Sequence, residues 1–206
     1  ARSICRSTLT AVLLAGPWTP VLGSSPGPSE YDLIATNRYL SSHWDAGQGL
    51  LTNDLRVILQ ARDGYIWIGS SAGLLRFDGV RFTAFNRRNT PQIPSDDVTS
   101  LVEDSLGTLW VSFLRGGVVS YADDRFSTPA YAESLAAVES YSVFFDGVGA
   151  LCVCTSRGLF RVEGGRSRYV EGIVGSARGG RSAPGGGYYV TGAGLFVVQL
   201  GAGATL

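Results

Sequence analysis

The chain has 206 residues, of which 45% are hydrophobic and 17% are charged. This composition is typical of a globular protein and excludes an intrinsically disordered one, and the length allows one or two domains with a substantial core. Seventeen basic residues, all of them arginine, balance seventeen acidic ones. The chain therefore lacks the excess positive charge that nucleic-acid-binding proteins carry, and no nucleic-acid partner is expected.

The first 23 residues have the three-part pattern of a secretory signal peptide. Arg2 and Arg6 supply a basic start, Leu9–Gly16 is a short apolar run, and small residues suited to a cleavage site follow. The apolar run is too short to span a bilayer, which takes about 20 residues. A soluble N-terminal helix is the alternative, but the four prolines that follow disfavour a helix packed in a core. We therefore predict a signal peptide over residues 1–23 and a lead-in segment, with a possible first strand, over 24–40.

From about residue 50 onward the sequence repeats itself. Three positions of the first copy recur 43 residues later, as Gly64 and Gly107, Trp67 and Trp110, and Gly73 and Gly116. A third copy follows at an offset of 42 from the second, with Cys152 at the tryptophan position, and a weaker fourth copy places Tyr189 near it. Repeats of about 40–45 residues that each contain four short strands are typical of β-propeller blades. The period therefore predicts an all-β chain with three to four four-stranded blades.

The first copy shows how one repeat divides into strands. Four are predicted: Val57–Gln60, Tyr65–Ile68, Leu74–Phe77 and Arg81–Phe85. The dipeptide Asp63-Gly64 joins the first two strands as a predicted type I′ hairpin turn, and Asp78-Gly79 joins the last two. The second strand is apolar on both faces, as expected for a sheet packed between two others. Because one such sheet cannot bury its faces alone, we expect Trp67 and Trp110 to lie in a core shared by neighbouring blades.

The sequence contains three cysteines. Cys5 lies in the predicted signal peptide. Cys152 and Cys154 are two residues apart in an apolar run, so on a strand they point to the same face, and this spacing gives poor geometry for a disulfide. Zinc would need further ligands, and the single histidine, His43, is distant in the sequence. We therefore predict two buried thiols and no metal site.

The polar residues do not form a recognisable catalytic group. His43 could serve as a general base, but it lies next to Trp44, outside the repeats, without an identifiable partner, so a surface or packing role is favoured. The acidic pairs Asp96-Asp97 and Asp123-Asp124 fall where the repeat predicts turns, and turn or capping chemistry explains them better than paired-carboxylate catalysis. Three arginines recur with the repeat and are expected to shield blade edges or pair with acids: Arg76, Arg81 and Arg125. The sequence therefore predicts no catalytic, cofactor-binding or metal-binding residues, and it points to no particular ligand-binding residues.

These repeats resemble the two-component regulator propeller repeats. The resemblance is carried by the segments Gln60–Gly69 (QARDGYIWIG) and Gly73–Phe82 (GLLRFDGVRF), preceded by Trp44, Gly49-Leu50 and Asn53. It covers residues 31 to about 166 and fades beyond. The resemblance implies the periplasmic sensor of a bacterial membrane receptor, whose cytoplasmic output is a histidine kinase or a diguanylate cyclase.

The resemblance also implies a layout for the whole receptor. Such sensors resemble one or two large propellers, commonly of seven blades, followed by a β-sandwich, a transmembrane helix and the output module. We accordingly expect an incomplete propeller over residues 41–206, with blades at about 52–88, 95–130, 138–169 and 180–200. An incomplete row of blades leaves an apolar sheet face and an unpaired edge exposed. The signature motifs of the kinase and the cyclase are absent from this sequence, so enzymatic activity is assigned to the parent protein and not to these residues.

The predicted function is extracytoplasmic ligand sensing in signal transduction. The parent is expected to be dimeric and anchored in the inner membrane, with this region in the periplasm. Its ligand is unknown, oligosaccharides are a candidate class, and no cofactor is expected. Two alternatives remain: a secreted propeller enzyme such as a polysaccharide lyase, and a structural interaction scaffold. The repeat pattern and the lack of clustered His, Tyr and Arg favour the sensor over the enzyme.

Overall fold

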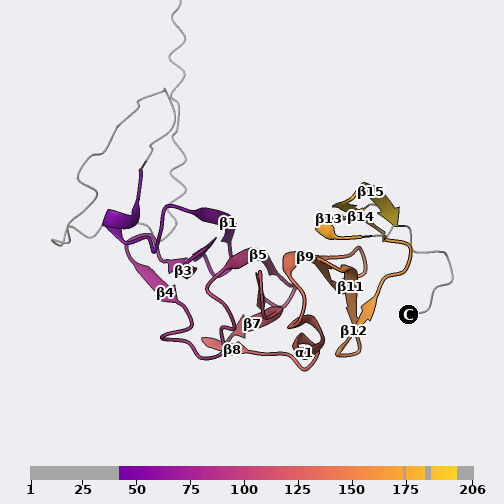
Figure 1. The fold of residues 1–206 in the computed structure, drawn as a ribbon. Helices are drawn as coiled ribbons and strands as arrows, with labels where there is room; N and C mark the ends of the chain where they lie inside the picture. Colours follow the sequence, from indigo (N-terminus) through magenta and orange to yellow (C-terminus); the bar gives the residue numbers. More distant parts are fainter. Residues whose placement is uncertain (1–41, 174, 184–186, 199–206) are drawn as a thin grey trace, which may run out of the picture.

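The computed structural model describes residues 42–173, 175–183 and 187–198. Over these residues the chain forms fifteen strands and two short helical segments, η1 (Ala46–Gln48) and α1 (Ala132–Leu135). The strands build four antiparallel sheets that follow one another in chain order (Figure 1). The prediction of an all-β propeller fold is confirmed. The predicted signal peptide and the lead-in over 24–40 lie outside the described residues.

The first two sheets have four strands each, hydrogen-bonded in the order of the sequence. The first sheet consists of β1 (Leu55–Gln60), β2 (Ile66–Ser70), β3 (Gly73–Phe77) and β4 (Phe82–Phe85). The second consists of β5 (Val98–Glu103), β6 (Leu109–Phe113), β7 (Val118–Ala122) and β8 (Arg125–Ser127). The short helix α1 lies between the second sheet and the third.

The third sheet repeats this order, and the fourth has three strands within the described residues. The third consists of β9 (Ser140–Phe145), β10 (Leu151–Thr155), β11 (Gly158–Glu163) and β12 (Arg166–Tyr169). The fourth consists of β13 (Ala177–Ser182), β14 (Tyr188–Gly192) and β15 (Leu195–Val198). The first strands of consecutive sheets contact one another, β1 with β5, β5 with β9 and β9 with β13. The sheets therefore fan out from a shared line of first strands, as propeller blades do.

All four sheets share one irregularity at the same place. The pairing between the first and second strands shifts by one residue in each sheet, which is the mark of a β-bulge. Counted from this bulge, one position of the second strand is equivalent in all four sheets, and it is occupied by Trp67, Trp110, Cys152 and Tyr189. The strand register therefore confirms that Tyr189 is the counterpart of the tryptophans.

The turn between β1 and β2 is not the predicted type I′ hairpin. A type I′ turn needs positive φ at both central residues, but Gly64 has a φ of 92° and Asp63 is not in this region. Backbone hydrogen bonds close a three-residue loop that ends on Gly64, so the prediction is wrong because the loop is one residue longer than a type I′ turn allows. Two consecutive residues with positive φ occur instead in the turn between β7 and β8, where Asp123 and Asp124 have φ of 49° and 57°.

Trp67 lies in the core as predicted, but Trp110 does so only in part. Trp67 is 1% exposed and packs edge-on against Tyr121 of the second sheet. Trp110 is half-buried: its ring stacks on Tyr131, and its Nε1 donates to Asp104 Oδ2 at 3.1 Å. The prediction of a second core tryptophan is thus only partly right. The segment next to α1 covers one face of the ring, and a carboxylate holds the N–H near solvent.

Cys152 and Cys154 are free, fully buried thiols on β10, as predicted. Both pack against the fourth sheet, in a core cluster that includes Phe144 and Tyr188. Burial raises the pKa of Cys154 to about 12 and also raises the pKa of Cys152. A thiol that stays protonated at neutral pH is a poor nucleophile and a poor metal ligand. The pair therefore has a packing role.

Candidate functional site

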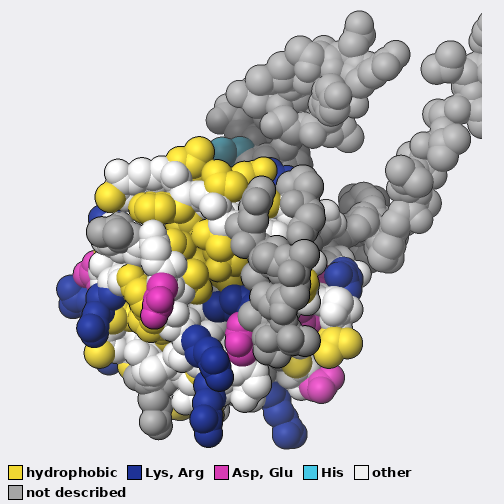
Figure 2. Space-filling model, turned by 90° about the vertical axis from the view of Figure 1, so that its right-hand side faces the viewer, with side chains coloured by type: hydrophobic (Ala, Val, Ile, Leu, Met, Phe, Trp, Pro, Cys, Tyr) yellow, Lys and Arg dark blue, Asp and Glu magenta, His cyan; other side chains and the backbone are white. Residues whose placement is uncertain are grey.

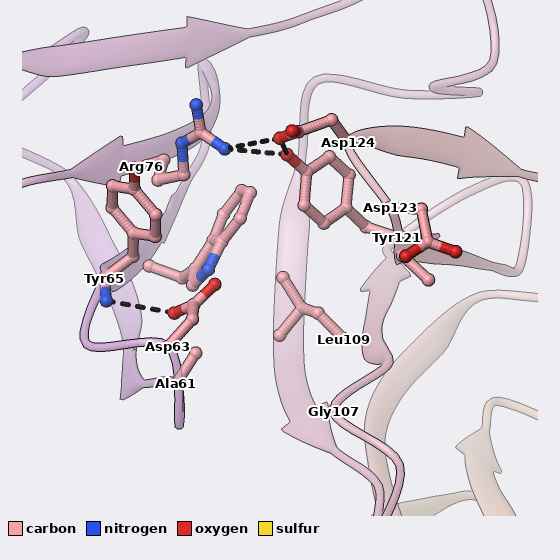
Figure 3. A pocket seen from close by; sticks show the side chains of 11 residues that line it. Ala61, Asp63, Tyr65, Arg76, Gly107, Leu109, Tyr121, Asp123 and Asp124 are labelled. Carbon is pink, nitrogen blue, oxygen red and sulfur yellow. Dashed lines mark hydrogen bonds and ion pairs between the residues drawn. The ribbon is translucent and has the colours of Figure 1, made fainter.

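A pocket of about 260 Å³ opens between the first two sheets. It lies at the end of the sheets where the β1–β2 and β7–β8 turns come together (Figure 3). Apolar lining comes from Ala61, Trp67 and Leu109, and the polar lining comes from an arginine, two tyrosines and three aspartates. The volume is close to the lower end of the range for small-molecule sites, about 300–1,000 Å³. We refer to this site as the Arg76 pocket.

Arg76 is the central polar residue of the pocket. It extends from β3, and its Nη1 donates to Tyr121 Oη at 2.8 Å and to Asp124 Oδ1 at 3.1 Å. Its guanidinium carbon lies 4.6 Å from the centroid of the Tyr65 ring, within the range of a cation–π contact. Arg76 therefore joins the first sheet to the second across the pocket, as the dashed lines in Figure 3 show.

Tyr121 and Asp124 complete a three-membered network with Arg76. Tyr121 Oη donates to Asp124 Oδ1 at 2.8 Å. Burial, reinforced by this hydrogen bond, raises the pKa of Tyr121 to about 12. The hydrogen bonds from Tyr121 and Arg76 lower the pKa of Asp124. At neutral pH the network therefore consists of a neutral phenol, a carboxylate and a guanidinium.

Two further carboxylates lie on the rim of the pocket, Asp63 and Asp123. Asp63 Oδ1 accepts the backbone N–H of Tyr65 at 3.0 Å, which holds the β1–β2 turn. The lining as a whole carries three carboxylates and one guanidinium, so it has an excess of negative charge. Carboxylates accept hydrogen bonds and do not donate them. The rim therefore suits a ligand that is rich in hydroxyl or ammonium groups.

The chemistry available in the pocket favours binding over covalent catalysis. Its lining contains no histidine, cysteine, serine or threonine, so it lacks the usual pairing of a nucleophile with a base. The one phenol with a strongly shifted pKa, Tyr121, is held protonated. Among the residues that the structure describes, no three His, Cys, Asp or Glu side chains gather in a way that could hold a metal ion. In the same ranges, none of the helices has the length and apolar character that crossing a membrane requires.

Other residues singled out in the sequence lie outside the lining of the Arg76 pocket. His43 is an exposed residue just before η1. Asp96 accepts the backbone N–H of Arg87 at 2.8 Å, and Asp97 forms an ion pair with Arg56. The contact of Asp96 is of the turn kind that the sequence favoured, whereas the ion pair of Asp97 with Arg56 of β1 links two sheets and was not predicted.

Sequence reasoning treated Asp123-Asp124 as a solvated turn and missed its partner. Arg76 and Asp124 are 48 residues apart in the chain and meet only because the two sheets stack. One signal was present in the repeat: Tyr121 takes the place of Phe77 in the first copy. A phenol in place of a phenyl ring adds one hydroxyl, and a buried hydroxyl needs a hydrogen-bond partner. That change marks the interface at which a polar network forms.

The two best-preserved copies of the repeat match a known family. Residues 49–72 and residues 92–114 match the model of the two component regulator propeller. These two segments are similar to two-component regulator propeller repeats. They contain the second strands of the first two sheets, with Trp67 and Trp110, so the matched segments supply apolar strands that line the interfaces between sheets. No curated protein matches the sequence significantly.

Solved structures share the fold of this chain. One is the extracellular domain of a protein described as a hybrid two-component system, BT3049 from B. thetaiotaomicron, with a TM-score of 0.59 and 20% identity over 67% of this chain and 20% of its own. Another is the extracellular domain of a protein described as a one-component system, BT4673 from the same organism, with a TM-score of 0.60 and 19% identity over 70% of this chain and 20% of its own. The chain thus spans about a fifth of the length of these domains.

An enzyme has the same kind of fold. Virginiamycin B lyase from Staphylococcus aureus matches with a TM-score of 0.52 and 12% identity, over 73% of this chain and 58% of the lyase. At this identity the likeness is one of fold alone, because propeller folds host unrelated functions. Function must therefore be argued from the site and from the repeat family.

Proposed function

We propose that this chain is part of the ligand-sensing propeller of a bacterial receptor of the two-component type, and that it acts outside the cytoplasm. The observation that carries the proposal is the match of two segments to regulator propeller repeats. The fold shared with two extracellular domains described as parts of signalling systems supports it. In this proposal the chain binds a signal and performs no catalysis. A histidine kinase or diguanylate cyclase module elsewhere in the receptor supplies the output.

The proposed binding site is the Arg76 pocket, and the proposed ligand class is an oligosaccharide. Asp63 and Asp123 offer acceptors on the rim for sugar hydroxyl groups. Tyr65, the partly exposed aromatic residue of the lining, offers apolar surface for the C–H side of a sugar ring. A pocket with a polar rim and an apolar floor fits a ligand that has both kinds of surface.

The receptor is proposed to be a dimer anchored in the inner membrane, with this region in the periplasm. The Arg76–Asp124 contact joins two sheets at the pocket. A ligand that replaces or reinforces this contact would favour one spacing of the sheets over another. A ligand can shift such an equilibrium only by its difference in affinity for the two arrangements. In this proposal, binding at the pocket is coupled to the spacing of the two sheets.

Isothermal titration calorimetry with neutral oligosaccharides such as maltohexaose tests the proposal on the 206-residue chain. Arg76→Ala and Arg81→Ala form a matched pair, because both remove a recurring arginine but only Arg76 lines the pocket. We expect saturable binding that weakens at least tenfold in Arg76→Ala and is unchanged in Arg81→Ala. Equal loss in both variants, or no saturable binding of a broad set of sugars by the folded chain, would contradict the proposal.

A secreted propeller enzyme is the second candidate, because the fold is shared with a lyase. The single histidine of this chain, His43, is exposed and lies outside the Arg76 pocket. Incubation of the chain with polysaccharides, followed by detection of new reducing or unsaturated ends, separates the two functions. Turnover that disappears in His43→Ala would favour the enzyme. Binding without turnover favours the sensor.

A further inference from the structure

A second pocket, of about 510 Å³, lies between α1 and the third sheet. Its described lining shares no residue with the Arg76 pocket and consists of Ser134, Val138, Arg157, Phe160 and Tyr169. α1 lies beside β12 (Figure 1), and the hydroxyl oxygens of Ser134 and Ser167 are 2.5 Å apart where the two elements meet. The volume falls within the usual range for small-molecule sites, about 300–1,000 Å³. We refer to this site as the Arg157 pocket.

Two aromatic side chains form one wall of this pocket. Phe160 of β11 and Tyr169 of β12 are cross-strand partners, and their ring centroids are 5.6 Å apart with planes at 73°. Tyr169 is 47% exposed, yet its Oη donates to the backbone oxygen of Ile173 at 3.0 Å. Its ring also lies against Gly158, where a Cβ atom would be 2.7 Å from Tyr169 Cε2. The tyrosine ring is therefore held in place while much of it remains open to solvent.

The fold does not require aromatic residues at these two positions. The strand register makes Leu75 and Ala84 of the first sheet the counterparts of Phe160 and Tyr169. Leu75 and Ala84 are also cross-strand partners, so the first sheet forms the same strand order with a leucine and an alanine at these places. Pairing and packing within the sheet therefore do not account for the exposed tyrosine.

A basic side chain stands at the turn beside this aromatic wall. Thr155 Oγ1 accepts the N–H of Arg157 at 3.1 Å, as Ser70 Oγ accepts the N–H of Ala72 at 3.2 Å in the first sheet. Arg157 is therefore the counterpart of Ala72 in the same kind of turn, and it is exposed. Three of the five described lining residues thus differ from small or aliphatic counterparts in the first sheet. Together they bring two rings and a guanidinium to one pocket.

The surroundings of the Arg157 pocket favour an anionic ligand. The described lining supplies one guanidinium and no carboxylate, and residues 151–169 carry three exposed arginines and a single acidic residue, Glu163. Glu139 lies beside the same turn, where its backbone oxygen accepts the N–H of Ser156 at 2.9 Å, but its carboxylate accepts the Tyr141 hydroxyl at 2.8 Å. Figure 2 shows basic side chains standing out from the lower half of the side on which the third and fourth sheets lie. Such a surface attracts anions.

We propose that the Arg157 pocket binds a small aromatic carboxylate, with its ring against Tyr169 and Phe160 and its carboxylate on the Arg157 guanidinium. A guanidinium donates two parallel hydrogen bonds to a carboxylate, and a planar ring packs well against aromatic side chains in an offset or edge-on arrangement. The proposal goes beyond ligand sensing at the Arg76 pocket, because it concerns a separate site and a ligand of different chemistry. It holds or fails whether or not the chain binds oligosaccharides.

Isothermal titration calorimetry with indole-3-acetate and its uncharged counterpart indole-3-acetamide tests this proposal on the 206-residue chain. The two ligands share the ring and differ in the carboxylate, so we expect saturable binding of the acid that is at least tenfold tighter than that of the amide. Arg157→Gln should lower the affinity for the acid to that for the amide. Arg166→Gln is the matched control, because Arg166 is also an exposed arginine of the third sheet but does not line the pocket. It should bind the acid as the wild type does.

A second variant tests the aromatic wall separately from the charge. Tyr169→Leu keeps an apolar side chain but removes the ring, so we expect the acid and the amide to bind several times more weakly while the ratio of their affinities is kept. Acetate, which has the carboxylate without a ring, should bind at least tenfold more weakly than indole-3-acetate. Circular dichroism establishes that each variant is folded.

Several results would each overturn the proposal. Equal affinities of the folded wild-type chain for the acid and the amide would show that the carboxylate is not recognised, and acetate bound as tightly as indole-3-acetate would show that the ring is not. An equal loss of affinity in Arg157→Gln and Arg166→Gln would mean that a basic surface attracts anions without a specific site. A lack of saturable binding of indole-3-acetate, phenylacetate and benzoate would show that the pocket takes no aromatic carboxylate.

Discussion

The first and third sheets carry an arginine at the same position, yet the two arginines have opposite environments. Arg76 pairs across strands with Trp67, and Arg161 pairs across strands with Cys152. Arg76 reaches over to the next sheet and lines an open pocket. Arg161 stays within its own sheet, is buried, and forms an ion pair with Asp146 at 2.6 Å.

The residue opposite the arginine explains this difference. An indole fills the space between two sheets, so Arg76 is displaced toward the rim, where it finds Asp124. A thiol is much smaller, and the arginine can remain between the sheets if a buried carboxylate neutralises it. Asp146 provides that carboxylate, and Glu163 provides a second contact. A single change in the repeat, from tryptophan to cysteine, thus accompanies the change from an exposed polar network to a buried one.

The largest effect is expected from shortening the side chain at the position that distinguishes the two interfaces. Trp67→Ala should lower the free energy of unfolding by about 3–5 kcal/mol, because it opens a cavity in a closely packed core. Cys152→Ala at the equivalent position should cost about 1 kcal/mol, since little volume is lost. Urea unfolding of both variants measures the difference. Equal losses would show that the two interfaces do not depend on this residue as argued.

The buried ion pair provides the next largest effect. Asp146→Asn should lower the free energy of unfolding by about 3 kcal/mol, because it leaves the Arg161 guanidinium buried without its carboxylate. Asp63→Asn, on the rim of the Arg76 pocket, is the control and should change stability by no more than about 0.5 kcal/mol. A small effect of Asp146→Asn would mean that Glu163 alone neutralises Arg161.

Alkaline pH should weaken the interface between the third and fourth sheets. Burial raises the pKa of Cys154 from 9.0 to about 12 and that of Tyr188 from 10.0 to about 12. The unfolded chain therefore releases these protons at lower pH than the folded chain does. The contribution of these two groups to the free energy of unfolding is fully present below about pH 9. It falls as the pH rises toward 12, by up to about 1.4 kcal/mol per pH unit for each group.

Denaturant unfolding between pH 8 and pH 11 measures this slope. Cys154→Ala removes one of the titrating groups and should make the slope shallower, whereas Ser156→Ala, a change in the neighbouring turn, should leave it unaltered. An identical slope in Cys154→Ala and the wild type would rule out the thiol as a source of the alkaline loss.

The smallest effect on stability is expected at the Arg76 pocket. A change there is better detected as a shift in the pKa of Tyr121. Arg76 lowers the pKa of Tyr121 by its charge, against the larger upward shift that burial causes. Arg76→Ala should therefore raise the pKa of Tyr121 further while changing the free energy of unfolding little, because exposed ion pairs contribute little. Absorbance of the phenolate during alkaline titration reports the pKa, with Arg81→Ala as the control. A fall in the pKa would contradict the network as described.

The fold was largely predictable because its signals are local and are repeated. The spacing of Gly64, Trp67 and Gly73, and its recurrence in the second copy, predicted the strands and the stacking of sheets. The candidate pocket was not predictable in the same way. Arg76 was expected to pair with some acid, but its partner Asp124 was interpreted as a plain turn residue, since nothing in the order of the residues brings the two together.

The amino-acid sequence by itself determined the period of the sheets, the apolar character of both faces of each second strand, and the burial of the thiols on β10. These properties depend on neighbours along a strand and on a repeat that needs partners to bury its surface. The tertiary structure alone decided that Trp110 stays half-exposed and that Arg76 meets Tyr121 and Asp124. The contacts of Arg76 join residues more than forty positions apart, and both outcomes depend on which segment covers each face of a sheet.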